Sequence, residues 1–300
     1  MNILRSSKMK VTKAVIPAAG LGTRVLPASK SVPKEMLNIV DKPAIQYLVE
    51  EAAASGITDI LIITNRGKGI IEDHFDYSFE LESNLIKNPS KKAIYDQVHS
   101  VADKANIYYI RQKETQGLAH AILKAEAFVG NEPFAVLYGD DVIINDEYPV
   151  TRQLIDAFEK YGKPCVGVNE CSRENVKKYC SLDVTPVEGR VYGVNRIIEK
   201  PTDDEIMSLF AILGRNVLTP DIFDKIRATP VNAKGGEVYL TDTFSEMGKN
   251  GNLNCVNFEG KRYDMGDKFG IMEANVELAL KHPEIGDKFK EYIKEIAKGL

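Results

Sequence analysis

The chain has 300 residues, of which 44% are hydrophobic and 27% charged, a composition typical of a folded globular protein. Its 39 basic and 43 acidic residues give a formal net charge of −4, which argues against a nucleic-acid-binding surface. No apolar stretch approaches the ~18 residues of a membrane span, and the first ten residues lack the apolar core of a signal peptide. The four cysteines lack C-x-x-C spacing, and the four histidines lack metal-ligand spacing. We therefore expect reduced thiols in a cytoplasmic protein and no zinc site.

The first predicted element is a buried strand at residues 14–19, and a loop with two glycines and a cation follows it, Gly20-Leu21-Gly22-Thr23-Arg24. Glycines let the backbone come close to a ligand, and Arg24 and Lys34 supply positive charge, so the composition is that of a nucleotide phosphate site. The P-loop pattern is absent, and the dinucleotide fingerprint requires a third glycine where Val25 stands. On these residues alone, a tight turn remains an equal interpretation.

The segments that follow alternate between apolar strands and amphipathic helices. We predict helices at 43–55, 69–75, 80–101, 118–129 and 150–161, and strands at 60–64, 106–112, 134–138 and 164–169. This alternation predicts a parallel sheet with crossover helices, in which ligands bind at the carboxyl ends of the strands.

Two of the predicted strand ends carry polar groups. Gln112 and Gly117 follow one strand, and a Gln amide offers both a donor and an acceptor to the edge of a pyrimidine; the alternative is an exposed Gln without a ligand. Asp140 and Asp141 follow another, and adjacent carboxylates repel each other unless a cation lies near. Mg²⁺ commonly takes one or two carboxylates plus substrate phosphates. The alternative is a helix N-cap beside a solvated Asp.

From residue 171 onward the pattern changes. Residues 181–200 are typical of antiparallel strands around a turn at 188–190, which predicts a second lobe and a cleft for a second substrate. A strand at 210–218, a helix at 220–227, a helix ending near Gly248, a strand at 253–258 and helices at 268–281 and 284–300 complete the chain. We expect a single domain with parts at 11–170, 171–266 and 267–300.

Five motifs together resemble a known family. They are Gly20–Arg24 with Leu26-Pro27, Pro33-Lys34-Glu35-Met36-Leu37, Gly139-Asp140-Asp141, Glu199-Lys200-Pro201 and Arg262-Tyr263-Asp264-Met265-Gly266-Asp267-Lys268. This set resembles the sugar-nucleotide pyrophosphorylases (nucleotidyltransferases), above all the bacterial UTP–glucose-1-phosphate uridylyltransferases, over residues 13–280. The resemblance implies an α/β fold with a Rossmann-like, mixed, mostly parallel sheet flanked by helices, and a smaller antiparallel β lobe that binds the sugar. Residues 11–170 would form the nucleotide-binding half and 171–266 the sugar-binding half.

The resemblance also implies an activity and partners. The chain would transfer UMP from UTP to glucose 1-phosphate, with Mg²⁺ as cofactor, in an in-line attack that releases pyrophosphate. A homodimer or homotetramer is expected, without nucleic acid or membrane partners.

Site residues follow from the same resemblance, motif by motif. Asp140 and Asp264 would hold Mg²⁺, Arg24 and Lys34 would stabilise the leaving pyrophosphate, and Lys200 would hold the incoming phosphate. Gln112 and Gly117 would contact the base, Glu199 the sugar hydroxyls, and Asp141 the ribose or a bound water. The full set of expected substrate contacts is Ala19, Gly20, Gly22, Glu35, Gln112, Gly117, Asp141, Cys180, Glu199 and Gly214.

Some positions depart from the family pattern and keep alternatives open. Cys180 stands where the family has Gly, Asn38 where it has Pro, Asn216 where it has Tyr, and Thr115-Gln116 where it has Pro-Leu. The preferred sugar is therefore open. Three alternatives are a dTTP–glucose-1-phosphate thymidylyltransferase, a catalytically weak regulatory paralogue supported only by Cys180, and a glycosyltransferase. The last class typically carries Asp-x-Asp and lacks the Gly-x-Gly-Thr-Arg loop.

Overall fold

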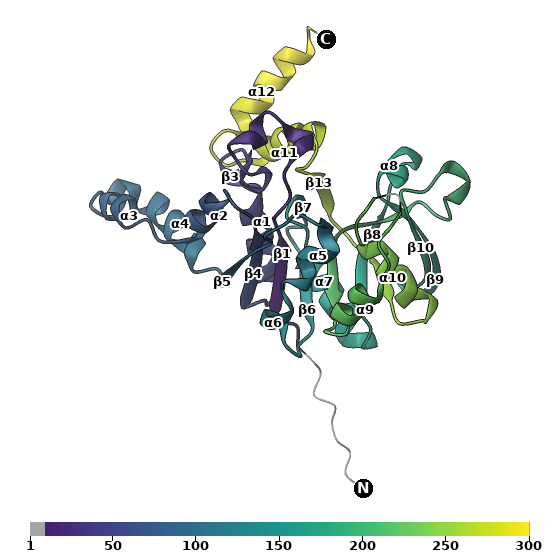
Figure 1. Ribbon diagram of the computed structural model, residues 1–300. Helices are drawn as coiled ribbons and strands as arrows, with labels where there is room; N and C mark the ends of the chain where they lie inside the picture. Colours follow the sequence, from purple (N-terminus) through teal and green to yellow (C-terminus); the bar gives the residue numbers. More distant parts are fainter. Residues whose placement is uncertain (1–9, 234, 300) are drawn as a thin grey trace.

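The computed structural model describes residues 10–233 and 235–299, so residues 1–9, considered above for a signal peptide, lie outside that range (Figure 1). A nine-stranded sheet in the order β5-β4-β1-β6-β11-β8-β12-β10-β9 forms the centre of the molecule. Its strands are β1 (Lys13–Pro17), β4 (Asp59–Thr64), β5 (Asn106–Arg111), β6 (Phe134–Leu137), β8 (Cys165–Glu170), β9 (Cys180–Glu188), β10 (Val191–Glu199), β11 (Phe210–Leu218) and β12 (Asn254–Asn257).

The sheet is mixed, as predicted, and mostly parallel in the sense that seven of its nine strands, all except β10 and β11, run in the same direction. β1 pairs in parallel with β4 and β6, β4 with β5, and β8 with β12. β11 runs antiparallel to both β6 and β8, and β10 runs antiparallel to both β12 and β9. The antiparallel pairing expected at residues 181–200 is therefore present, and it continues the central sheet because residues 191–193 of β10 pair with β12.

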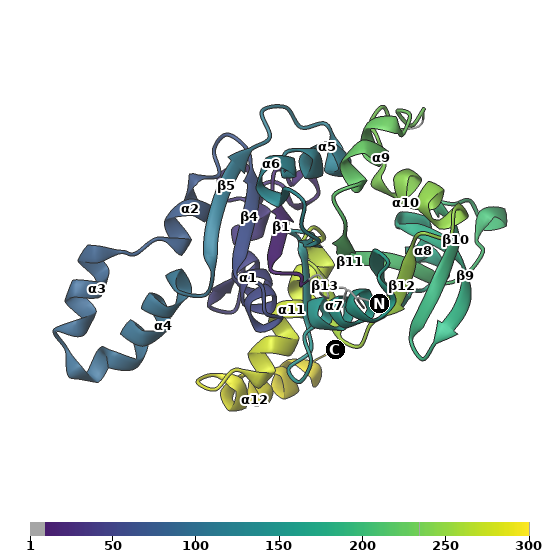
Figure 2. The same cartoon turned by 90° about the horizontal axis from the view of Figure 1, so that it is seen from below.

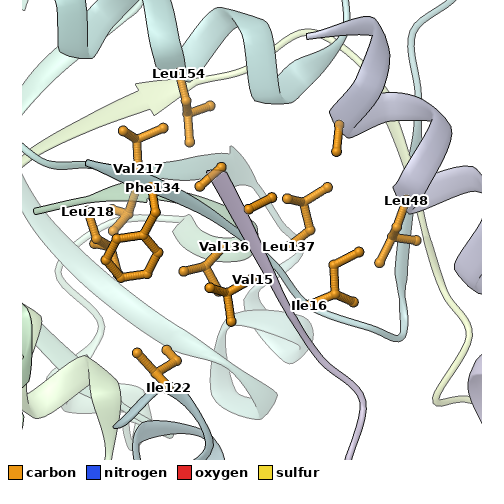
Figure 3. Close-up of a cluster of buried hydrophobic side chains, with 14 of the residues drawn as sticks. Val15, Ile16, Leu48, Ile122, Phe134, Val136, Leu137, Leu154, Val217 and Leu218 are labelled. Carbon is orange, nitrogen blue, oxygen red and sulfur yellow. The ribbon is translucent and has the colours of Figure 1, made fainter. Parts of the chain in front are cut away.

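Helices cover both faces of the sheet, because side chains along each buried strand alternate between the faces. In Figure 3, Leu154 of α7 (Val150–Tyr161) and Ile122 of α5 (Gly117–Leu123) lie on opposite sides of the strands that carry Val15 and Val136, and all four side chains are fully buried. The larger helices are α1 (Ala44–Ala54), α4 (Lys92–Ala102), α7 (Val150–Tyr161), α10 (Leu240–Lys249), α11 (Lys268–Lys281) and α12 (Gly286–Ala297). The shorter ones are α2 (Gly69–Phe75), α3 (Phe79–Ile86), α5 (Gly117–Leu123), α6 (Glu126–Val129), α8 (Arg173–Lys178) and α9 (Ile222–Ala228).

Two predicted helices are divided in the structure. The segment predicted as one helix at 80–101 forms α3 and α4, which meet at a turn that contains Pro89, a residue without a backbone N–H to continue a helix. The segment at 118–129 forms α5 and α6, separated by Lys124 and Ala125. α3 and α4 project from the body of the molecule in both views (Figure 2). No helix of the described residues has both the length and the apolar character that crossing a membrane requires.

Two small antiparallel pairings were not expected from the sequence. β2 (Asn38–Ile39) pairs with β3 (Lys42–Pro43), and β7 (Asp141–Ile144) pairs with β13 (Lys261–Asp264). In the second pairing Asp141 stands opposite Asp264. Strand β13, from the last third of the sequence, thus brings a third carboxylate, that of Asp264, beside Asp140 and Asp141.

Candidate active site

Two adjoining pockets lie beside the carboxyl ends of β1, β5, β6 and β10 and the start of β9. We call the first the loop pocket, of about 240 Å³; it is lined by Pro17, Ala19, Gly20, Lys34, Glu35, Gln112, Thr115, Gly117, Leu118, Ala121, Tyr138 and Asp140. We call the second the Lys200 pocket, of about 220 Å³; its lining includes Leu118, Tyr138, Lys178, Tyr179, Cys180, Glu199, Lys200, Ile212 and residues 237–241. Leu118 and Tyr138 belong to both walls. Predicted site residues from the first half of the sequence, in the loop pocket, therefore lie next to those from the second half, in the Lys200 pocket.

The charged side chains of the loop pocket are paired. The Lys34 ammonium donates a hydrogen bond of 2.5 Å to Asp140 Oδ2, and Lys68 forms a 2.8 Å ion pair with Glu35. Burial acts to lower the pKa of Lys34, but the neighbouring Asp140 carboxylate outweighs it and leaves that pKa raised. Burial acts to raise the pKa of Asp140, but Lys34 brings it below its ordinary value. Both groups are therefore charged at neutral pH.

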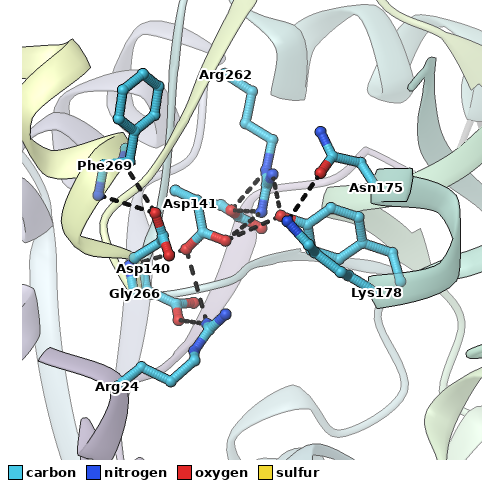
Figure 4. A network of polar contacts seen from close by, with 12 residues as sticks. Arg24, Asp140, Asp141, Asn175, Lys178, Arg262, Gly266 and Phe269 are labelled. Carbon is cyan, nitrogen blue, oxygen red and sulfur yellow. Dashed lines mark hydrogen bonds and ion pairs between the residues drawn. The ribbon is translucent and has the colours of Figure 1, made fainter. Parts of the chain in front are cut away.

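Arg24 links the two carboxylates expected to hold a metal. Its Nη2 lies 3.9 Å from Asp140 Oδ2 and 3.8 Å from Asp264 Oδ1 (Figure 4). The Gly266 N–H donates to Asp264 Oδ1 at 2.9 Å, and a Cβ at Gly266 would lie 2.8 Å from Asp140 Oδ2. Because both carboxylates approach one cationic nitrogen, their oxygens face a common point. Such hard oxygen donors fit Mg²⁺.

The described residues do not complete a metal site alone. Among them, no group of three or more His, Cys, Asp or Glu side chains could hold a metal ion. Mg²⁺ usually keeps several waters or substrate oxygens beside one or two carboxylates. Asp140 and Asp264 therefore fit a metal that substrate phosphates help to coordinate.

Arg262, which was not predicted to be a site residue, orients the neighbouring carboxylates. Its Nε donates to Asp141 Oδ1 at 2.7 Å, and its Nη1 donates to the Tyr179 hydroxyl at 3.0 Å. That hydroxyl donates to Asp264 Oδ2 at 3.0 Å, so Arg262 orients Asp264 through Tyr179. Recognition of residues 261–264 as a strand would have placed Arg262 and Asp264 on one face, because side chains repeat every second residue.

Three expected substrate contacts line neither pocket. The buried Asp141 is bonded to Arg262, and burial raises its pKa to about 6. Gly214 has a φ of +68°, and a Cβ there would lie 2.6 Å from Asp141 Cβ, so Gly214 makes room for that side chain. Gly22 has a φ of +66°, and its carbonyl accepts a 2.7 Å hydrogen bond from Ser29 Oγ. Their contacts with substrate stay predictions.

The remaining contacts expected for the nucleotide lie in the loop pocket. The Ala19 carbonyl accepts a hydrogen bond of 2.5 Å from Asn65 Nδ2, and Gly20 lies against the end of Lys34. The Gln112 side chain donates through Nε2 to the Gly117 carbonyl at 3.2 Å. The structure thus brings Gln112 and Gly117 together at one wall of the pocket.

In the Lys200 pocket, Glu199 and Lys200 form no ion pair with any residue that the structure describes. Lys200 has a φ of +46°, and its backbone N–H donates to the Tyr179 carbonyl at 2.8 Å. Its Nζ lies 5.6 Å from the centre of the Tyr239 ring, and no carboxylate of the described residues forms an ion pair with it. Glu199 accepts a 3.1 Å hydrogen bond from Thr241 Oγ1, and burial raises the pKa of Glu199 to about 7. An unpaired cation beside a carboxylate acceptor suits a ligand with a phosphate and hydroxyl groups.

Cys180, the departure from the family glycine, is buried at the start of β9 and lines the Lys200 pocket. Its Sγ accepts a hydrogen bond from the Ile212 N–H at 3.3 Å, and burial raises the pKa of the thiol. The residue therefore acts through its volume and not as a thiolate nucleophile.

Comparisons with known proteins agree with this geometry. The nucleotidyl transferase family model matches residues 13–281. UTP–glucose-1-phosphate uridylyltransferase YngB of Bacillus subtilis is 50% identical over 291 residues, which are 97% of each chain. A crystal structure of UDP-glucose pyrophosphorylase complexed with UDP-glucose is 39% identical with a TM-score of 0.83, covering 91% of this chain and 100% of that one. UTP-bound UDP-glucose pyrophosphorylase from Acinetobacter baumannii is 34% identical with a TM-score of 0.87, covering 95% and 99%.

These matches span nearly the whole chain and include both pockets. The chain belongs to the nucleotidyl transferase family, and within it to the UTP–glucose-1-phosphate uridylyltransferases.

Proposed function

We propose that the chain transfers UMP from UTP to glucose 1-phosphate, giving UDP-glucose and pyrophosphate. The observation that carries the proposal is the junction of the two pockets at Leu118 and Tyr138. One pocket holds the Lys34–Asp140 pair beside the glycine loop, and the other holds Lys200. A nucleoside triphosphate and a sugar phosphate bound in them would meet at the shared wall. The names of the relatives, which specify UTP and UDP-glucose, support this choice of substrates.

The chemistry requires positioning and charge neutralisation. A phosphate oxygen of glucose 1-phosphate attacks the α-phosphorus of UTP, and the bond from that phosphorus to the oxygen bridging to the β-phosphate breaks. The attacking oxygen is already ionised at neutral pH, so no general base is needed. The obstacle is repulsion between two anions, which fixed cations reduce. We assign Lys200 to the sugar phosphate, and Arg24 and Lys34 to the leaving pyrophosphate.

Asp140 and Asp264 would hold Mg²⁺. When bound, the metal would supply positive charge next to the phosphates. The lowered pKa of Asp140 keeps this carboxylate anionic, and Gly266 and Tyr179 fix the orientation of Asp264. Glu199 would accept hydrogen bonds from sugar hydroxyls, since a carboxylate is an acceptor when ionised.

We also propose which part of the domain binds which substrate. Residues 11–170 would bind the nucleotide and 171–266 the sugar, with 267–300 as C-terminal helices. The continuous sheet supports a single domain. The β7–β13 pairing joins the two halves, because Asp264 reaches the loop after β6. A homodimer or homotetramer and a cytoplasmic location remain proposals, and light scattering after gel filtration tests the oligomeric state.

The decisive experiment measures pyrophosphate release from glucose 1-phosphate with UTP, dTTP, CTP, ATP or GTP, with and without Mg²⁺. We expect rapid pyrophosphate release with UTP, and this release should require Mg²⁺. Equal or faster release with dTTP would favour the thymidylyltransferase alternative. No release with any nucleotide would favour the regulatory paralogue.

A further inference from the structure

We infer that His120 is a positioning residue that fixes the amide of Gln112, so that the loop pocket selects a base with an N–H on its pairing edge. The base class is uracil or thymine, and cytosine is rejected. The inference rests on the proposed function, because it assumes that the base of the nucleoside triphosphate faces Gln112.

The hydrogen bonds around Gln112 determine which way its amide points. The side chain is 3% exposed at the end of β5, and its Nε2 lies 3.2 Å from the Gly117 carbonyl oxygen and 2.8 Å from His120 Nδ1. A carbonyl oxygen can only accept, so the amide NH₂ must face it. His120 Nδ1 then also accepts, which places the ring proton on Nε2 of this histidine. The two contacts together occupy both amide hydrogens.

The amide oxygen is consequently the free end of Gln112. Oε1 accepts no hydrogen bond from any residue of the described part of the chain, and Gln112 lines the loop pocket. An acceptor at this wall pairs with N3–H of uracil or thymine, whereas N3 of cytosine is itself an acceptor. A site built to bond one partner rejects an analogue that leaves the group unpaired. This arrangement alone does not separate UTP from dTTP, because both bases carry N3–H.

The surroundings of His120 keep its ring neutral. Lys124 lies one turn later, directly after α5, Glu114 lies in the loop before the helix, and Arg227 and Glu237 line the adjoining cavity. Burial, together with Lys124, lowers the pKa of His120, while Glu114 acts in the other direction. A protonated ring would turn Nδ1–H toward the amide NH₂, so two donors would face each other. Acidification should therefore release the amide and weaken base selection.

The test compares kcat and KM for UTP and CTP, at saturating glucose 1-phosphate and Mg²⁺, in wild type, His120→Leu and His120→Asn. In His120→Leu only the Gly117 carbonyl still holds the amide, so we expect the UTP-to-CTP ratio of kcat/KM to fall about tenfold, the effect of losing one hydrogen bond. The change should lie in KM for UTP, with kcat nearly constant. His120→Asn, whose amide oxygen can accept, should restore most of the selectivity. His99→Asn on α4 is the matched histidine control and should leave the ratio unchanged.

Unchanged selectivity in a folded His120→Leu variant, or equal losses for UTP and CTP, would overturn the inference. If His120→Leu does not fold, pH profiles carry the test: the wild-type ratio should fall on acidification while that of His120→Asn stays constant, and identical profiles would overturn it. The triphosphate titrates alike in both nucleotides and cancels in the ratio. A wild type inactive with UTP and glucose 1-phosphate would instead defeat the proposed function, so the two failures are distinguishable.

Discussion

The loop pocket and the Lys200 pocket hold their charges in different ways. The charged side chains that line the loop pocket, Lys34, Glu35 and Asp140, each have a partner of opposite charge. In the Lys200 pocket, neither Glu199 nor Lys200 forms an ion pair with any described residue, although they adjoin in the sequence. The first pocket neutralises its charges within the protein, whereas the second leaves them for a ligand.

The difference follows from how each pocket is assembled. The loop pocket gathers charges from segments far apart in the chain, and buried charges are costly unless they are paired. The Lys200 pocket takes its cation from an exposed position where water compensates the charge. Charge changes should therefore affect folding and catalysis in the loop pocket, but catalysis alone in the Lys200 pocket.

The largest expected effect is that of Asp140→Asn, which removes the carboxylate that pairs with Lys34 in the loop pocket. It removes one of the two proposed metal ligands and the partner of Lys34, so we expect kcat to fall by about 10³, the upper range for one electrostatic group. Pyrophosphate release under saturating Mg²⁺ measures the loss. The exposed Asp146→Asn is the matched control and should retain wild-type kcat. A loss below about tenfold would remove Asp140 from the reaction centre.

Lys68→Met tests whether pairing in the loop pocket stabilises the fold. The change leaves Glu35 buried without its cation, and we expect a loss of about 3 kcal/mol in the free energy of unfolding by urea denaturation at pH 8. Burial raises the pKa of Glu35, so the carboxyl protonates readily on acidification and the loss should be smaller at pH 5. Lys160→Met, which breaks an exposed pair with Glu188, should have no measurable effect. Equal losses at both pH values would contradict this prediction.

Lys200→Ala tests whether the cation of the Lys200 pocket binds the sugar phosphate without contributing to stability. Since Lys200 makes no ion pair with the described residues, its loss should leave Tm unchanged, while kcat/KM for glucose 1-phosphate falls by about 10². The KM for UTP should stay within about twofold, because UTP is expected to bind in the loop pocket. Lys177→Ala, at an exposed pair with Asp203, is the control and should behave as wild type. Near-normal turnover by Lys200→Ala would exclude this lysine from the site.

The smallest effect is the pH dependence that Glu199 should impose. Burial raises its pKa to about 7, and only the carboxylate accepts hydrogen bonds on both oxygens. We expect kcat/KM for glucose 1-phosphate to rise about tenfold from pH 6 to pH 8 as Glu199 ionises. Glu199→Gln should abolish the part of this rise that Glu199 causes. The pH dependence of kcat/KM that remains in the variant would come from ionisation of the sugar phosphate. An identical profile in the variant would show that Glu199 does not contribute.

The sequence was sufficient for the parallel strands of the sheet and for the grouping of several candidate residues around the glycine loop, because these depend on local patterns. Continuous apolar runs predict buried parallel strands, and parallel strands end at one edge, so Gln112 and Asp140 had to lie near the glycine loop. Residues whose role depends on an ion pair with a residue far away in the sequence could not be predicted from local patterns. Lys68 and Arg262 were missed because the carboxylates that they pair with, Glu35 and Asp141, lie 33 and 121 residues away in the chain.

By itself, then, the amino-acid sequence determined the α/β class of the fold and the types of side chain that could contact phosphates, since period and residue type are local properties. Only the tertiary structure decided which of these charges are paired. The β7–β13 register brings Asp264 opposite Asp141, and the path of β10 leaves Lys200 unpaired among the described residues. Ion pairing depends on distance in space, and separation along the chain does not fix that distance.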